Sequence, residues 1–119
     1  MSVDSIVTLK NIGKIYDTGV EALKGVNFEF PVGKLSTLLG PSGCGKTTLL
    51  KIIGGLIDAT SGEVWVKGKP ITGPGADRAF VFQDFALMPW ATILRNVAFC
   101  LELRGVLKEA RLEIARKYI

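Results

Sequence analysis

The feature that most constrains this chain is a glycine-rich loop, GPSGCGKTT at residues 40–48, between a short apolar run and an apolar helical pattern. The run before it, KLSTLLG at residues 34–40, is typical of a strand that is buried on both faces. After the loop, apolar residues recur at the spacing of one helix face, at Leu49, Ile52, Ile53 and Leu56. The sequence therefore predicts a strand, a tight loop and a helix in direct succession.

The loop fits the pattern G-x-x-x-x-G-K-[ST], whose backbone amides surround phosphate groups. Glycine lets the backbone bend into a nest of inward-pointing N–H groups, and the positive end of the following helix favours an anion. Lys46 adds a full charge for the outer phosphates, and the Thr47 hydroxyl can coordinate Mg²⁺. We predict that the whole loop binds phosphate, through Gly40, Pro41, Ser42, Gly43, Cys44, Gly45, Lys46, Thr47 and Thr48. The alternative is a glycine-rich turn with no ligand.

The rest of the chain reads as strands that alternate with helices. Alternating apolar and polar residues predict half-buried strands at 7–9, 26–30 and 64–66, of which the first two should be antiparallel. The short apolar run AFVF at 79–82 predicts another buried strand. Helical spacing predicts one helix over Leu94–Leu101, which Gly105 can close. A third helix should begin at Lys108, with no terminating residue before the chain stops and with Leu112, Ala115 and Ile119 on one side. This order predicts an α/β fold.

Composition excludes several classes of protein. The 119 residues are 48% hydrophobic, which fits one folded domain rather than a disordered chain. We find no secretory signal, and no apolar run approaches the ~18 residues of a membrane span. Cys44 and Cys100 lack metal-ligand spacing and are interpreted as reduced cytoplasmic thiols, with a redox role for Cys44 as the alternative. The net charge of +4 is scattered, so no nucleic-acid partner is predicted.

Along its whole length the chain resembles the ATP-binding cassette (ABC) ATPases. The likeness runs through residues 7–56 and 61–106, around the loop and the segment AFVFQ. It implies a P-loop NTPase fold in which residues 1–119 form part of one ABC ATP-binding domain, with an N-terminal antiparallel β part and the start of the helical subdomain. Within the family, residues 73–99 look most like the ATPases of nitrate, sulfonate, taurine or bicarbonate importers.

The resemblance assigns two more binding residues and implies ATP and Mg²⁺ as ligands. Tyr16 matches the aromatic residue that stacks on adenine, a contact of a kind worth ~1–3 kcal/mol for nucleic-acid bases. Gln83 matches the glutamine of the Q-loop, whose amide can contact Mg²⁺ and the γ-phosphate, and it joins Lys46 as a catalytic candidate. The alternatives are a core tyrosine at position 16 and a polar strand end at position 83.

The resemblance also implies partners. The segment Phe85–Trp90 matches the region that meets the membrane permease, and its residues Phe85, Met88 and Trp90 suit an interface. The alternative is a staple in which Trp90 packs on the following helix. Intact relatives also pair with a second ATPase subunit and act indirectly with a solute-binding protein, which implies a cytoplasmic location, peripheral on the inner face of the membrane.

Several family elements have no match in this sequence. There is no LSGGQ-like signature loop, no aspartate is followed by glutamate, and the chain contains no histidine to act as the switch residue. We therefore expect the N-terminal half of a cassette, as a truncation or gene fragment. Three functions remain open: an importer ATPase subunit, a non-catalytic nucleotide-binding module, and a non-functional fragment. A GTPase is disfavoured because no Asn-Lys-x-Asp motif occurs.

We expect the purified 119-residue chain not to turn over ATP. The base that activates water and the clamp from a second subunit supply most of the rate in this chemistry, so their removal should lower turnover by ~10³-fold or more. The measurement is steady-state release of inorganic phosphate in the presence of Mg²⁺. Release near the rate of an intact ABC ATPase would contradict the expectation.

Overall fold

The computed structural model describes residues 4–84 and 87–119. The chain divides into two compact units, Met1–Phe80 and Val81–Ile119, which are described separately below. Among the described residues, no helix combines the length and the apolar character that a membrane crossing requires.

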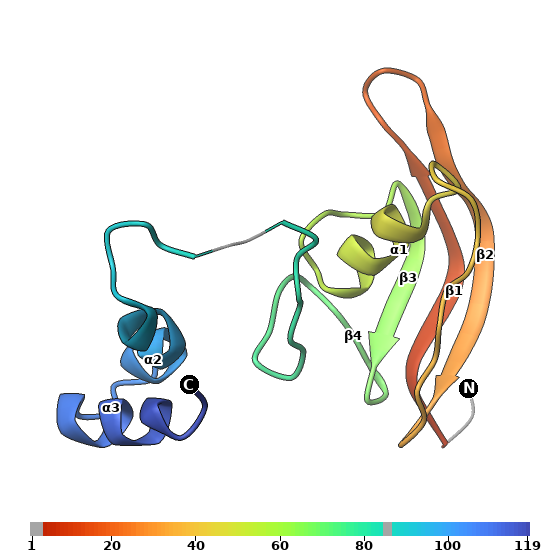
Figure 1. The fold of residues 1–119 in the computed structure, drawn as a ribbon. Helices are drawn as coiled ribbons and strands as arrows, with labels where there is room; N and C mark the ends of the chain where they lie inside the picture. Colours follow the sequence, from red (N-terminus) through yellow and green to blue (C-terminus); the bar gives the residue numbers. More distant parts are fainter. Residues whose placement is uncertain (1–3, 85–86) are drawn as a thin grey trace. The chain divides into compact units, whose positions relative to one another are not determined.

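The first unit is built on an antiparallel sheet with the strand order β2-β1-β3-β4 (Figure 1). Its strands are β1 Ser5–Ile15, β2 Glu21–Pro31, β3 Ser61–Val66 and β4 Lys69–Pro70. In β1, an inner strand of the sheet, Leu9 lies opposite Phe28 of β2 and Val64 of β3. The predicted strands at 7–9, 26–30 and 64–66 are thus confirmed. Leu9 and Val64 are buried as the alternation predicts, whereas Phe28 is 55% exposed.

The helix α1, Lys46–Ile53, packs on this sheet. Leu49 and Ile52 are buried in one cluster with Leu9 and Ile12 of β1, while Leu50 on another face of the helix is 45% exposed. The predicted apolar stripe is confirmed for Leu49, Ile52 and Ile53, which meet the core, whereas Leu56 lies beyond the end of the helix and is 38% exposed. Most of the stability of so short a helix must come from this packing.

Both glycine-terminated helices end in the same arrangement. After α1, the amide of Gly55 donates to Ile52 O (3.0 Å) and that of Leu56 to Lys51 O (2.9 Å), with Gly55 in the left-handed region. This is a Schellman motif, which satisfies carbonyl groups left open at a helix end. After α2, Ile93–Leu103, the same pair of bonds involves Gly105, so the prediction that Gly105 closes this helix is confirmed.

Two predicted strands are not formed. Residues 34–40 and 79–82 have no regular secondary structure, and Leu35, Leu39 and Val81 are at least 89% exposed. A parallel strand that is buried on both faces needs a hydrogen-bonded strand beside it and a layer on each face. The sheet found among the described residues supplies no such neighbours, so these predictions are wrong for this structure.

The second unit contains α2 Ile93–Leu103 and α3 Lys108–Arg116. The two helices are in contact, and Ala98 of α2 and Ala115 of α3 are each 1% exposed. The helix α3 ends at Arg116, and Ile119 is 69% exposed, so the prediction of a helix continuing to Ile119 is wrong. The last amides instead bond three residues back, from Lys117 to Ile114 and from Tyr118 to Ala115, which tightens the final turn and ends the helix.

The backbone around Gly62 in β3 leaves no room for a side chain. Its φ is +84°, and a Cβ atom would lie 2.2 Å from the carbonyl oxygen of Asn11 in the neighbouring strand. Gly68 also has a positive φ, +78°, but apart from its two chain neighbours no atom of the described residues lies within 4 Å of its Cβ position.

We expect Gly62→Ala to lower the free energy of unfolding by at least ~2 kcal/mol, because two paired strands must move apart, and Gly68→Ala to lower it by only ~1 kcal/mol. Urea unfolding followed by circular dichroism measures both variants against the parent chain. Equal losses of unfolding free energy in the two variants would show that the close approach of Gly62 to Asn11 does not restrict the side chain at position 62.

Candidate functional site

The glycine-rich loop is held against β2 at Gly45. Gly45 has a φ of +97°, and a Cβ atom there would lie 2.8 Å from the carbonyl oxygen of Ala22 and 2.9 Å from Cδ2 of Leu23. Both the backbone conformation and the close approach therefore require glycine. Packing against the core therefore restricts residue 45, which precedes the lysine of the motif, to glycine, in addition to any restriction from a ligand.

The helix α1 begins directly after this glycine. Gly45 is its N-cap residue with no side-chain hydrogen bond, and the first helical bond runs from Leu49 N to Gly45 O (2.9 Å). The amides of a first helical turn have no partner within the helix, and they lie at the positive end of its dipole. This end of α1 can therefore donate several hydrogen bonds to an anion.

The side chain of Lys46, near the end of the glycine-rich loop, reaches back to the first residue of the loop. Its Nζ atom donates a hydrogen bond to the carbonyl oxygen of Gly40. An ammonium group has three donors, so this contact leaves others for a ligand. The side chain of the next residue, Thr47, is exposed, which suits a hydroxyl that is to meet a metal ion brought in with phosphates.

Tyr16, which follows β1, lies beside the start of α1. Its hydroxyl oxygen is 2.9 Å from Oγ1 of Thr48, and Nζ of Lys14 lies 5.3 Å from the centre of its ring. Nζ of Lys14 also donates to the carbonyl oxygen of Asp58 (2.8 Å). The structure thus brings a predicted base platform to the phosphate loop, across 32 positions of sequence. Sequence reasoning missed the Thr48 contact and Lys14, because no local pattern signals such a pairing.

Gln83 belongs to the second unit, where it is exposed and follows irregular backbone rather than the predicted strand. Of the predicted docking segment, Phe85 lies outside the described residues. Met88 is half-buried, whereas Trp90 is 76% exposed. A side chain so exposed does not pack on α2, so the staple interpretation of Trp90 is wrong.

Asn96 is a structural residue of this segment that sequence reasoning missed. Its Oδ1 accepts from the amide of Met88 (2.7 Å), and its Nδ2 donates to the carbonyl oxygens of Met88, Ala91 and Thr92. The side chain thus ties the backbone before α2 to the first turn of the helix. An asparagine inside a helical pattern was the available signal, because its amide competes for backbone hydrogen bonds.

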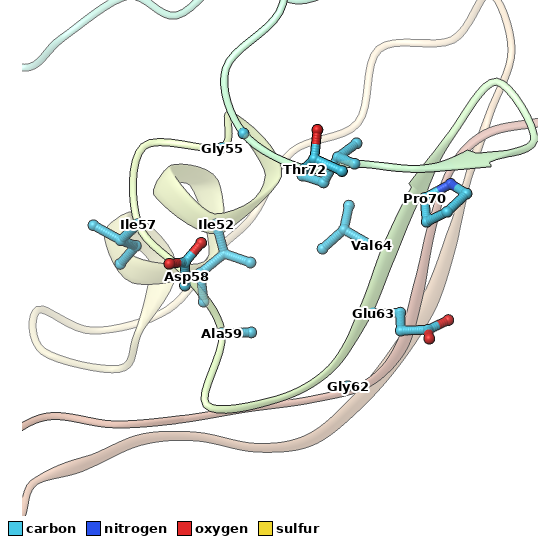
Figure 2. Close-up of a pocket in the computed structure, with 12 residues that line it drawn as sticks. Ile52, Gly55, Ile57, Asp58, Ala59, Gly62, Glu63, Val64, Pro70 and Thr72 are labelled. Carbon is cyan, nitrogen blue, oxygen red and sulfur yellow. The ribbon is translucent and has the colours of Figure 1, made fainter.

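A hollow of about 400 Å³ lies elsewhere in the first unit (Figure 2). Its apolar lining includes Ile52 of α1, Val64 of β3 and Ile71, and Asp58 lies beside Ile52. Glu63 also belongs to the lining, but its carboxylate points to the other side of β3 from Val64. Neither the glycine-rich loop nor Tyr16 lines it. Within residues 4–84 and 87–119, no three histidine, cysteine or acidic side chains gather in a way that could hold a metal ion. The glycine-rich loop therefore remains the best candidate site.

A sequence model of the family described as ABC transporter matches residues 23–119. Among curated proteins, an uncharacterized ABC transporter ATP-binding protein of Methanocaldococcus jannaschii, MJ0412, is 51% identical over 114 residues. That alignment covers 93% of this chain and 43% of the relative. The taurine import ATP-binding protein TauB of Escherichia coli K12 is 48% identical over 101 residues, which cover 85% of this chain and 40% of TauB. The chain thus spans less than half the length of these curated relatives.

Solved structures show the same likeness. The dimeric post-hydrolysis state of the ATP-binding cassette MJ0796, bound to ADP and Pi, superimposes with a TM-score of 0.78 at 36% identity. The match covers 93% of this chain and 54% of that structure. With a family match over most of its residues and this structural agreement, the chain belongs to the ABC transporter family and has the P-loop NTPase fold of its ATPase domains.

Proposed function

We propose that this chain binds ATP with Mg²⁺ as part of the ATP-binding subunit of an ABC importer. The observation that carries the proposal is the loop Gly40–Thr48, bent by left-handed glycines and followed at once by the first turn of α1. A dipole end, free amides and the Lys46 ammonium converge there, which is what a polyphosphate requires. The family of the chain supports the same ligand.

The residues present fit both parts of the ligand. Gly45 gives the backbone a shape that a Cβ atom would prevent, and Tyr16 offers an aromatic ring near the loop for adenine. The Thr47 hydroxyl is an oxygen ligand of the kind Mg²⁺ prefers, and phosphate oxygens and water would complete the coordination. By its resemblance to the Q-loop glutamine of the family, Gln83 is proposed as a contact to Mg²⁺ and the γ-phosphate. Bound Mg²⁺ would neutralise phosphate charge.

The solute class of the importer is proposed from two lines of support. One relative is named for taurine import, and it is 48% identical over 101 residues. The segment at residues 73–99, which contains AFVFQ and the exposed Trp90, carries the resemblance to the nitrate, sulfonate, taurine and bicarbonate group. We therefore propose a small oxyanion of this kind as the transported solute.

The proposed partners follow from the exposed surface and from the family. Trp90, at 76% exposure, and the segment Phe85–Trp90 around it are proposed to meet a membrane permease. A second ATPase subunit is proposed because the MJ0796 cassette is a dimer. A solute-binding protein would act indirectly through the permease, and the subunit would lie on the cytoplasmic face of the membrane.

A second candidate function is a nucleotide-binding module without catalysis. The sequence holds the phosphate loop, Tyr16 and Gln83, but no histidine and no Asp-Glu pair. These residues suffice for binding, whereas hydrolysis also needs a group that positions the attacking water.

Replacement of Lys46 tests the proposal, with Lys51 of the same helix as a matched control. We expect Lys46→Ala to weaken ATP binding by at least about tenfold, because charge-assisted hydrogen bonds to the outer phosphates are lost. Lys51→Ala removes the same charge at the other end of α1 and should leave affinity nearly unchanged. Calorimetry with Mg²⁺ measures both. If the parent chain gives no heat with ATP or ADP, or if Lys46→Ala binds as tightly as the parent, the proposed function is wrong.

A further inference from the structure

We propose that the hydroxyl of Thr48 positions the Tyr16 ring, so that the platform for the base and the loop for the phosphates form one hydrogen-bonded unit. The inference rests on the proposed function and deepens it, because it assigns a role to a contact between the two halves of the site. Thr48 would thereby act on the nucleobase as well as on phosphate.

The first support is the geometry at Thr48. Its Oγ1 atom lies 2.9 Å from the Tyr16 hydroxyl oxygen, the length of a hydrogen bond. Thr48 lies in the first turn of α1 and is half-buried, and its neighbour Leu49 is buried in the core. The hydroxyl is therefore attached to a fixed part of the structure, as a positioning group must be.

The second support is that the Tyr16 backbone is held separately from its ring. The Tyr16 amide donates to Val20 O (2.9 Å), and the Gly19 amide donates to Tyr16 O (2.8 Å), which closes a turn after β1. The amide of Ile15 donates to Oγ1 of Thr60 (2.9 Å). These backbone contacts leave the side-chain torsions of Tyr16 free, and the hydrogen bond at its hydroxyl group fixes them.

Lys14 provides a second contact to the same ring. Its Nζ atom lies 5.3 Å from the ring centre, within the range of a cation–π interaction, and Asp58 O anchors the ammonium at 2.8 Å. This contact places Lys14 over one face of the ring, and we infer that a base would stack on the opposite face. The Thr48 bond at the rim and Lys14 at one face thus hold the ring at different points.

The chemistry of the hydroxyl groups lets Thr48 serve both halves of the ligand. A hydroxyl has one donor and two acceptor sites, whereas an ionised phosphate oxygen only accepts. If the Tyr16 hydroxyl donates to Thr48 Oγ1, the Thr48 proton remains available for a phosphate oxygen. If Thr48 instead donated to the Tyr16 hydroxyl, the Thr48 proton would no longer be available for a phosphate oxygen. A bound nucleotide therefore favours donation from Tyr16 to Thr48 and strengthens the connection between ring and loop.

The test compares ATP with inorganic tripolyphosphate, which has no base, by calorimetry on the full 119-residue chain with Mg²⁺. We expect Tyr16→Phe, which keeps the ring and removes the hydroxyl, to weaken ATP binding about threefold to tenfold, as for one lost hydrogen bond. Its affinity for tripolyphosphate should match that of the parent chain. A purely structural role for the contact would change both affinities alike.

Two changes at Thr48 complete the experiment. Thr48→Ser keeps the hydroxyl and should bind both ligands more tightly than Thr48→Val, which lacks it. In the Thr48→Val background, Tyr16→Phe should add less than about twofold, since its partner is already gone.

Full additivity of the two changes, or an unaltered ATP affinity in Tyr16→Phe, overturns the positioning role while leaving nucleotide binding intact. If the parent binds neither ATP nor tripolyphosphate, the proposed function fails and this role fails with it.

Discussion

The contact of Gly45 with β2 connects the glycine-rich loop to the hydrophobic core. The loop backbone approaches Ala22 so closely that a Cβ atom on Gly45 would lie 2.8 Å from its carbonyl oxygen. The helix begins at the next residue, and its first buried side chain, Leu49, joins the cluster around Ile12. The orientation of the loop amides therefore follows from how α1 packs on the sheet, because the first helical turn and the core-facing stripe belong to one rigid segment.

The same packing brings together the two halves of the candidate site. The central strand β1 ends beside the start of α1, so Tyr16 meets Thr48 although they are 32 residues apart. Within α1, Leu49 faces the core, while Thr48 faces the tyrosine hydroxyl. One helix therefore packs on the sheet and presents ligand-binding groups through neighbouring residues that point in different directions.

Much of the fold could be predicted wherever a local pattern determines the structure. The strands β1 and β2, the stripe of α1 as far as Ile53 and the stop at Gly105 all emerged correctly, because each reflects a periodicity or a backbone conformation. The expected strands at 34–40 and 79–82 failed, since a strand depends on neighbours that its own residues do not encode. The exposure of Trp90 and the bonds of Asn96 likewise depend on segments that meet only in the folded unit.

By itself, the sequence determined the glycine-rich loop, the lysine and hydroxyl that follow it, and the helix behind them, all within residues 40–53. These features are local, since φ values and helical spacing depend on a few consecutive residues. Only the tertiary structure decided that Gly45 lies against β2, that Tyr16 contacts Thr48, and that Lys14 reaches the tyrosine ring. Such contacts arise from strand register and from helix packing, which bring distant side chains within hydrogen-bonding distance once the core has formed.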